Sequence, residues 1–230
     1  MTASKSSSSQ PVSDRRTQRQ SRIVECATRL FAESGFAACD MEGVAEALGI
    51  AKGTLYLYFP GKQDLFFACV DAAMSQMIDE IQKAVQLEEK PFEKIGGAIR
   101  TYLKFFEQHP QYVELLLQER AIFKDRQRPS YFQHRDANRA PWRALYSELV
   151  ACGQLRGDLA VEGMLNSVSN LVYGTMFTNY FTGRATSLDE QYEMIMRTVF
   201  QGLLSDQARA DWQLPCPHDD ADNQARPTDL

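Results

Sequence analysis

The amino-acid sequence predicts an all-α protein with a small N-terminal unit of three helices and a larger helical remainder. Apolar residues recur at helical spacing along most of the chain, no segment alternates like a β-strand, and glycines and prolines separate the periodic segments. The 230 residues, of which 44% are hydrophobic, are enough to bury at least one substantial core.

The first helix is expected to begin near Arg15 and to end at Gly35, which stands where a helix C-cap is expected. Its apolar positions fall at i, i+4, i+7 and i+8, the stripe of an amphipathic helix. They are Ile23, Ala27, Leu30 and Phe31. Residues 1–14 are rich in serine and lack this periodicity, so we expect them to form a disordered leader.

Two short helices are expected next, with a turn between them. Asp40 is a candidate N-cap for a helix over residues 41–47, and Gly49 interrupts the pattern before a helix over residues 51–58. A Pro-Gly pair then ends the third helix. We expect these three helices to form one domain, residues 15–62.

The other helices are expected within residues 63–205. A long helix starts near Asp64 and runs into the eighties, another follows Pro91, and residues 112–120 form a third. Pro141 either marks the start of the next helix or kinks it.

Capping residues predict where the last two helices begin. Asp158 is a candidate cap for a long helix that reaches about Tyr180, and Ser187 with Glu190 forms a capping box for the final helix. The acidic residues 206–230 are expected to be a disordered tail.

The charge distribution leaves DNA binding open. The formal net charge is −5, but residues 1–22 carry five basic side chains and one acidic side chain. Because charges more than about 8 Å apart are largely screened at physiological salt, a phosphate backbone would respond to this local basic arm more than to distant acidic groups.

Several classes of protein are disfavoured by what the sequence lacks. It has no apolar run of membrane-spanning length and no secretory signal at its N-terminus, so we expect no membrane partner and a cytoplasmic location. Its five cysteines are widely spaced without a Cys-x-x-Cys pair, which argues against a disulfide framework and a zinc site. We find no catalytic constellation, metal-ligand spacing or phosphate-binding loop, and we expect neither enzyme activity nor a metal or cofactor.

The strongest functional pattern lies in residues 41–60, whose spacing is typical of a helix-turn-helix. Ala45 is small where two helices cross, and Gly49 allows a positive φ in the turn. The apolar residues that lock the two helices together are Val44, Leu48, Ile50 and Leu55. The groups left exposed to contact phosphates or base edges are those of Lys52, Gly53, Thr54, Tyr56 and Tyr58. Lys62 follows and is expected to reach a phosphate.

A set of positions within residues 19–67 forms a denser pattern. They are Gly35-Phe36, Val44-Ala45, the run from Leu48 to Tyr56, Tyr58-Phe59, Lys62 and Asp64-Leu65. This pattern resembles the N-terminal signature of the tetracycline-repressor (TetR) family of bacterial regulators. The resemblance implies a three-helix DNA-binding domain, joined by a fourth helix to a helical domain for ligand binding and dimerisation.

The resemblance also implies which residues contact DNA. The family's contact positions fall on Lys52, Gly53, Thr54, Tyr56, Tyr58 and Lys62, and basic residues of the first helix, such as Arg19 and Arg22, are expected to join them. Two positions depart from the family pattern. The second helix opens with Cys39-Asp40 where the family often has Thr or Ser, so we expect a phosphate contact to be lost. Leu57 is expected to be a packing residue.

A two-fold dimer is implied for the C-terminal part, where the resemblance is looser. We expect the last two helices, residues 159–180 and 188–204, to form a four-helix bundle with those of a second copy. Its expected interface residues are Met164, Val168, Leu171, Thr175, Ile195, Val199 and Leu203. Two recognition helices about 34–36 Å apart would then read a near-palindromic DNA operator.

A cavity for a small apolar effector is also implied, among the middle helices of the C-terminal part. Aromatic side chains are candidates to line it, although core packing is the common role of such residues. The candidates are Phe106, Trp142, Tyr146, Tyr173 and Phe177.

The sequence therefore favours a ligand-responsive transcriptional regulator, and specifically a repressor that its effector releases from the operator. Ligand and operator weaken each other's binding by the same factor, with the fourth helix as the candidate moving part. One alternative is a helical cytosolic carrier or enzyme with a vestigial helix-turn-helix, which would show no salt-sensitive DNA retention. Another is a regulator that activates, or that has no ligand response.

Overall fold

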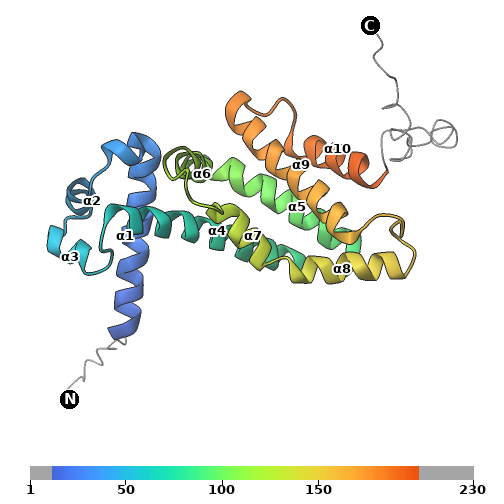
Figure 1. The fold of residues 1–230 in the computed structure, drawn as a ribbon, viewed down its shortest axis with the longest axis horizontal. Coiled ribbons are helices and arrows are strands. Elements are labelled where there is room, and N and C mark those ends of the chain that lie inside the picture. The colour runs from blue at the N-terminus through green and yellow to red at the C-terminus, as the bar shows by residue number, and fades with distance from the viewer. Residues whose placement is uncertain (1–11, 202–230) are drawn as a thin grey trace, which may run out of the picture. The chain divides into compact units, whose positions relative to one another are not determined.

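A computed structural model describes the backbone of residues 12–201 and the side chains of residues 15–201. All regular structure in this part of the chain is helical, in elements α1 to α10 (Figure 1). By its internal contacts the chain divides into two compact units, with the boundary between Tyr192 and Glu193. The predicted acidic tail and residues 1–11 of the predicted leader lie outside the described residues.

The first helix, α1 (Val12–Ala38), begins three residues before Arg15 and contains a kink near its end. Gly35 has φ 79° and ψ 158°, a conformation that glycine adopts far more readily than other residues. The predicted end of the helix at Gly35 is therefore the kink, after which a last short segment is helical again. Of the predicted apolar stripe, Ile23, Ala27 and Phe31 are buried.

The helix-turn-helix is present, with α2 (Met41–Leu48) and α3 (Lys52–Tyr56) on either side of a turn. Asp40 caps α2 as predicted, because its Oδ1 accepts a hydrogen bond of 2.8 Å from the backbone N–H of Gly43. Gly49 ends α2 with φ 64°. The predicted small core is formed mainly by Val44, Ala45 and Leu55, which are buried.

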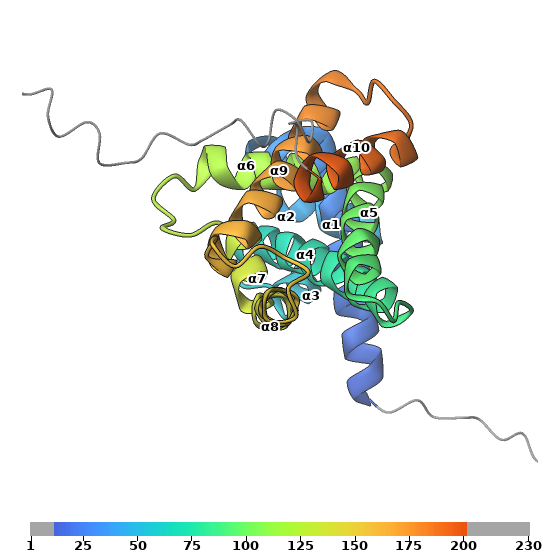
Figure 2. The same ribbon diagram turned by 90° about the vertical axis from the view of Figure 1, so that its right-hand side faces the viewer.

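The long helix α4 (Lys62–Gln86) packs against α1 and continues along α5 (Pro91–Gln108) and α7 (Ser130–Ala137). Figure 2 looks nearly along α4, with α5 on one side and α7 and α8 (Ala140–Ala151) on the other. None of the helices in the described part is long and apolar enough to cross a membrane.

One element differs from the sequence-based expectation, and one open alternative is decided. The helix α7 was not expected as a separate helix, because only Ser130 and Tyr131 of its eight residues are buried and no apolar stripe marks it. Pro141 lies in the first turn of α8, so it marks the start of that helix and does not kink it.

The capping predictions for the last helices have opposite outcomes. The helix α9 (Val161–Thr182) has Ala160 at its N-cap and no side-chain cap, so the prediction for Asp158 is wrong. Asp158 instead accepts a hydrogen bond of 2.6 Å from Nε of Arg156. The capping box before α10 (Leu188–Phe200) is confirmed, with reciprocal hydrogen bonds of 2.9 and 3.2 Å between Ser187 and Glu190.

An aromatic cluster joins α1 and α4 to the end of α6 (Pro110–Ile122). Neighbouring rings in it have centroids 4.8–5.9 Å apart, most of them in edge-to-face or tilted arrangements. Its members are Phe31, Phe36, Phe66, Phe67 and Phe123. The helix-turn-helix is thereby attached through α1 to the two helices that lead into the rest of the unit.

Candidate DNA-binding surface and ligand cavity

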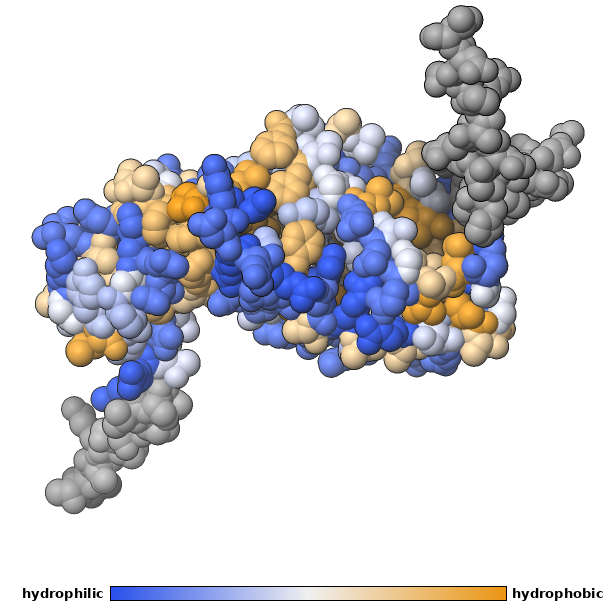
Figure 3. All heavy atoms as spheres, in the orientation of Figure 1, coloured by the Kyte–Doolittle hydropathy of each residue, from blue (hydrophilic) through white to orange (hydrophobic). Residues whose placement is uncertain are grey.

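A basic surface lies along the N-terminal half of α1, beside the end of α3. It borders a shallow hollow, and none of the residues that line this hollow is acidic. The lining residues are Arg15, Arg16, Gln18, Arg19, Arg22, Leu57 and Tyr58. Arg19 and Arg22 were expected here, whereas Arg15 and Arg16 were not selected from the sequence. Figure 3 shows a largely hydrophilic surface over this end of the unit.

The predicted contact residues in and just after α3 differ in their exposure. Lys52, Gly53 and Tyr56 are exposed, and Thr54 and Tyr58 are half-buried. A Cβ atom at Gly53 would meet no protein atom within 4 Å, so this backbone is open to close approach by another molecule.

Lys52 forms a surface ion pair with Glu42, with 3.1 Å between Nζ and Oε2. Both side chains are more than half exposed. Exposed pairs of this kind contribute roughly 0.2–1 kcal/mol, so a DNA phosphate can replace the carboxylate at small cost.

Leu57 does not pack inside, which corrects the sequence-based expectation. Its side chain is 76% exposed, next to Tyr58, whose ring lies 5.9 Å from the guanidinium carbon of Arg16. The helix α3 ends at Tyr56, and Leu57 follows it directly. The side chain of Leu57 faces outward beside the basic surface. A large apolar side chain at this place is available to contact a thymine methyl group.

Lys62 was expected to reach a phosphate, but its ammonium group is engaged inside the protein. Its Nζ donates to the carbonyl oxygens of Phe36 at 2.6 Å, Cys39 at 2.9 Å and Ala37 at 3.3 Å. An ammonium has three N–H groups, and all three have partners here. Lys62 therefore holds the end of α1 against the start of α4, and it is not free to bind a phosphate in this structure.

A cavity of about 380 Å³ lies among α4, α5, α7, α8 and α9. Its size and mostly apolar lining are typical of sites for small organic molecules. Trp142 and Tyr146 line it as expected, whereas Phe106, Tyr173 and Phe177 do not. These three lie among neighbouring aromatic rings in edge-to-face or tilted contact, in which the ring centroids of Tyr173 and Tyr131 are 4.5 Å apart.

The charged groups of the cavity wall already have partners in the protein. Nε of Arg135 donates to Asp136 at 2.9 Å, and Nε of Arg139 donates to Glu162 at 2.7 Å. Burial raises the pKa of Tyr146 to about 12, so its phenol is neutral at physiological pH. The cavity is therefore a mostly apolar space whose wall also carries two ion-paired arginines and a few neutral polar groups.

Two adjacent residues of α6 connect the helix-turn-helix to the cavity helices. Gln118 is buried, and its Nε2 donates to the carbonyl of Phe31 at 2.8 Å while its Oε1 accepts from the N–H of Phe36 at 2.9 Å. Both partners flank the kink at Gly35, where the backbone leaves the regular helical hydrogen-bond pattern. Gln118 thus fixes the kinked end of α1 to α6.

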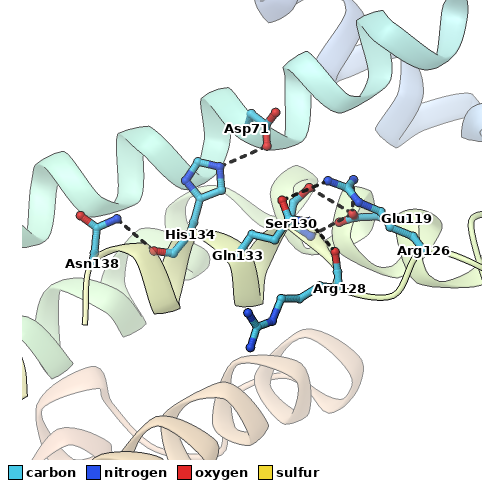
Figure 4. A network of polar contacts seen from close by, with 8 residues as sticks. All are labelled: Asp71, Glu119, Arg126, Arg128, Ser130, Gln133, His134 and Asn138. Atoms are coloured by element: carbon cyan, nitrogen blue, oxygen red, sulfur yellow. Dashed lines mark hydrogen bonds and ion pairs between the residues drawn. The ribbon is translucent and has the colours of Figure 1, made fainter. Parts of the chain in front are cut away.

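The next residue, Glu119, holds the start of α7 (Figure 4). It is 1% exposed, and its Oε1 accepts from the N–H and the hydroxyl of Ser130 at 2.9 and 3.0 Å and from Arg126 at 2.7 Å. Its Oε2 is buried without a partner in the described part of the chain. On α7, His134 also contacts Asp71 of α4 at 3.1 Å. One turn of α6 therefore contacts α1 on one side and α7 on the other.

The expected dimer residues have varied surroundings. Leu171 is exposed, Met164, Thr175 and Val199 are half-buried, and Ile195 is buried. Val168 lines the cavity, and Leu203 lies outside the described residues. Other apolar side chains of α9 are exposed, including Tyr180 at 36% and Phe181 at 64%, and Figure 3 shows apolar surface over this helix. The dimer interface stays a prediction.

The sequence of this chain is similar to those of known transcriptional regulators. Residues 23–69 match the model of a family described as bacterial regulatory proteins, tetR family. YerO of Bacillus subtilis, an uncharacterized HTH-type transcriptional regulator, is 27% identical over 117 residues, which cover 50% of this chain and 40% of YerO. The HTH-type transcriptional repressor KstR2 of Mycobacterium tuberculosis is 24% identical over 145 residues, which cover 63% of this chain and 72% of KstR2.

Solved structures share the fold. FadR of Bacillus subtilis, in complex with stearoyl-CoA, has a TM-score of 0.66 at 18% identity, over 81% of this chain and all of the FadR chain. The structure of KstR2, described as a ketosteroid transcriptional regulator, has a TM-score of 0.59 at 20% identity, over 82% of this chain and 96% of the other. At these sequence identities, the structural similarity shows that this chain shares the fold of the two proteins.

The placement of Lys62 predicts a loss of stability when its charge is removed. Lys62→Met keeps most of the side-chain length but leaves three carbonyls without their donor, so we expect the free energy of unfolding to fall by about 1–3 kcal/mol. Urea denaturation followed by circular dichroism measures this change. Lys52→Met is the matched control, and we expect it to change stability by less than about 0.5 kcal/mol. Equal stability of the two variants would contradict the role assigned to Lys62.

Proposed function

Residues 23–69 place this chain in the TetR family of bacterial regulatory proteins, and we propose that it is a homodimeric transcriptional repressor. In this proposal it binds a near-palindromic DNA operator in the bacterial cytoplasm and leaves it when a small, largely apolar effector binds. The observation that carries the proposal is the pair Gln118 and Glu119, which connects the helix that carries the basic surface to α7 in the wall of an apolar cavity.

In the proposed complex α3 lies in the major groove. Lys52, Thr54, Tyr56 and Tyr58 supply donors for base edges and phosphates, and Gly53 lets the backbone come close. The arginines of α1, namely Arg15, Arg16, Arg19 and Arg22, neutralise phosphates beside the groove. Leu57 supplies an apolar contact that the sequence alone had assigned to the core.

A second copy of the chain is proposed to pack against α9. This helix carries exposed apolar side chains at Leu171, Tyr180 and Phe181, and exposed apolar groups are typical of protein interfaces. A two-fold dimer presents two copies of α3, and half-sites about one helical turn apart make the operator near-palindromic.

The cavity suggests the class of effector. Its lining is mostly aliphatic and aromatic, and its charged residues are already paired. Two of the similar structures point the same way, since FadR was solved with stearoyl-CoA, whose acyl chain is apolar, and KstR2 is described as a ketosteroid transcriptional regulator. We propose that a largely apolar molecule enters this cavity too.

Two helices are proposed to carry the response from the cavity to DNA. The helix α4 has Leu65 and Phe66 in the core beside α1, and further along it Met77 and Ile78 line the cavity. The helix α6 carries the Gln118–Glu119 pair, which holds α1 and α7 together. An effector that moves α7 or α4 therefore changes the angle of α1 and the spacing of the two copies of α3.

Selection of bound sequences from a random DNA pool, followed by titration of the winner at two salt concentrations, tests the proposed DNA binding. We expect a near-palindrome, and we expect Thr54→Ala or Tyr56→Ala to weaken binding to it. Arg19→Ala should weaken binding to any DNA and reduce the salt slope by about one unit. Absence of enrichment together with salt-insensitive retention would refute the proposal and favour a carrier or an enzyme.

Loss of the contact between α6 and α1 is expected to weaken operator binding. Gln118→Leu removes the hydrogen bonds that fix the kink of α1, so α3 is held less firmly and we expect several-fold weaker operator affinity in fluorescence anisotropy. Gln111→Leu on the same helix is the control, because Gln111 bonds only to His109 among the described residues. An operator affinity for Gln118→Leu equal to that of the control would count against this route.

A further inference from the structure

Two buried phenols stand together in the wall of the cavity. Tyr102 of α5 and Tyr131 of α7 are each 6% exposed, both line the cavity, and their hydroxyl oxygens lie 3.0 Å apart. The hydroxyl of Tyr102 also lies 3.5 Å from the sulfur of Met176 on α9. The pair therefore joins three of the helices around the proposed effector site.

The pair has one more donor than it has good acceptors. Two phenols bring two O–H groups, and only one of them can lie between the two oxygens. If Tyr131 donates to Tyr102, the hydrogen of Tyr102 is left with the thioether of Met176, which is a weak acceptor. If Tyr102 donates, the hydrogen of Tyr131 has no further acceptor in the described part of the chain. A buried donor with a poor partner is unfavourable by about 1–3 kcal/mol.

Both phenols are neutral at physiological pH. Burial raises the pKa of Tyr131 to about 12 and raises the pKa of Tyr102 as well. They therefore offer hydrogen atoms to an acceptor and carry no charge that would attract a cation.

The surroundings of the pair favour an acceptor without charge. A carboxylate buried in an apolar cavity needs a charged partner to offset its lost hydration. The two arginines of the wall, Arg135 and Arg139, are already paired with Asp136 and Glu162. A carbonyl or hydroxyl oxygen needs only the hydrogen bond that the phenols have to give.

We propose that the effector is a largely apolar molecule with a neutral carbonyl or hydroxyl oxygen, which accepts a hydrogen bond from the Tyr102–Tyr131 pair. The inference rests on the proposed function of the cavity and adds the chemical feature that the cavity selects. Tyr102 and Tyr131 are then the specificity-determining residues of the site.

Three naphthalenes of similar shape test the inference. The probes are 2-acetylnaphthalene, which has a neutral carbonyl, 2-ethylnaphthalene, which has no oxygen, and 2-naphthoate, which has a carboxylate. Binding to the full chain is measured by titration calorimetry. We expect the ketone to bind roughly three- to tenfold more tightly than the hydrocarbon, which is the range of one net hydrogen bond, and more tightly than the carboxylate.

The double variant Tyr102→Phe/Tyr131→Phe is expected to lose the preference for the ketone. Replacing both partners of a buried hydrogen bond by apolar groups of the same shape is close to neutral for stability, and the melting temperature checks this. Tyr146→Phe is the matched control, because Tyr146 also lines the cavity but lies outside the pair. Loss of the preference in this control alone would show that Tyr146 reads the oxygen, and it would overturn the inference.

The two proposals fail in different ways. Equal binding of the ketone and the hydrocarbon to the unaltered protein, or tighter binding of 2-naphthoate, overturns the inference and leaves a cavity that binds apolar molecules. If none of the three binds, the effector role of the cavity fails together with the inference, while the operator selection still decides DNA binding separately.

Discussion

The arrangement of this protein depends on a short segment of α6 that satisfies buried polar groups on two sides. Gln118 bonds the backbone on either side of the kink in α1, and Glu119 bonds the first N–H group and the hydroxyl of Ser130 at the start of α7. A buried backbone group without a partner is costly, so neither helix can leave α6 without leaving such a group behind. The two contacts are one residue apart, and a change in either shifts the same helix.

In the proposed function, this constraint lets the proposed DNA-binding surface and the proposed effector cavity influence each other within one chain. The aromatic cluster around Phe66 and Phe123 gives the α1 side a rigid base, and Lys62 closes the end of α1 over the start of α4. On the other side, α7 contributes Tyr131 to the cavity and contacts α4 through His134. Packed interiors switch between discrete arrangements more readily than they deform continuously, which suits a regulator with two states.

The sequence predicted the features that depend on neighbouring residues. The Asp40 cap, the turn at Gly49 and the Ser187–Glu190 box were all read correctly, because a cap or turn is determined within a few residues. The helices α2 and α3 were predicted for the same reason, since they are short and close in sequence.

The features that were missed or wrong depend on distant parts of the chain. Lys62 meets carbonyls 23 to 26 residues away, and Gln118 meets α1 more than 80 residues away, which no local pattern reveals. Of the five aromatic candidates for the cavity, Trp142 and Tyr146 line it, because periodicity shows that a residue is buried but not what it is buried against. The polar helix α7 had no apolar stripe to indicate it, although it forms part of the cavity wall.

The most direct test of the coupling between the cavity and DNA uses Trp142 as a reporter. Trp142 lines the cavity, and the sequence contains one other tryptophan, Trp212, which is replaced by phenylalanine for the measurement. Because coupling between two sites is reciprocal, saturation with the selected operator should change the emission spectrum of Trp142, while a scrambled duplex at the same concentration should not. An unchanged spectrum at full operator occupancy would contradict the account.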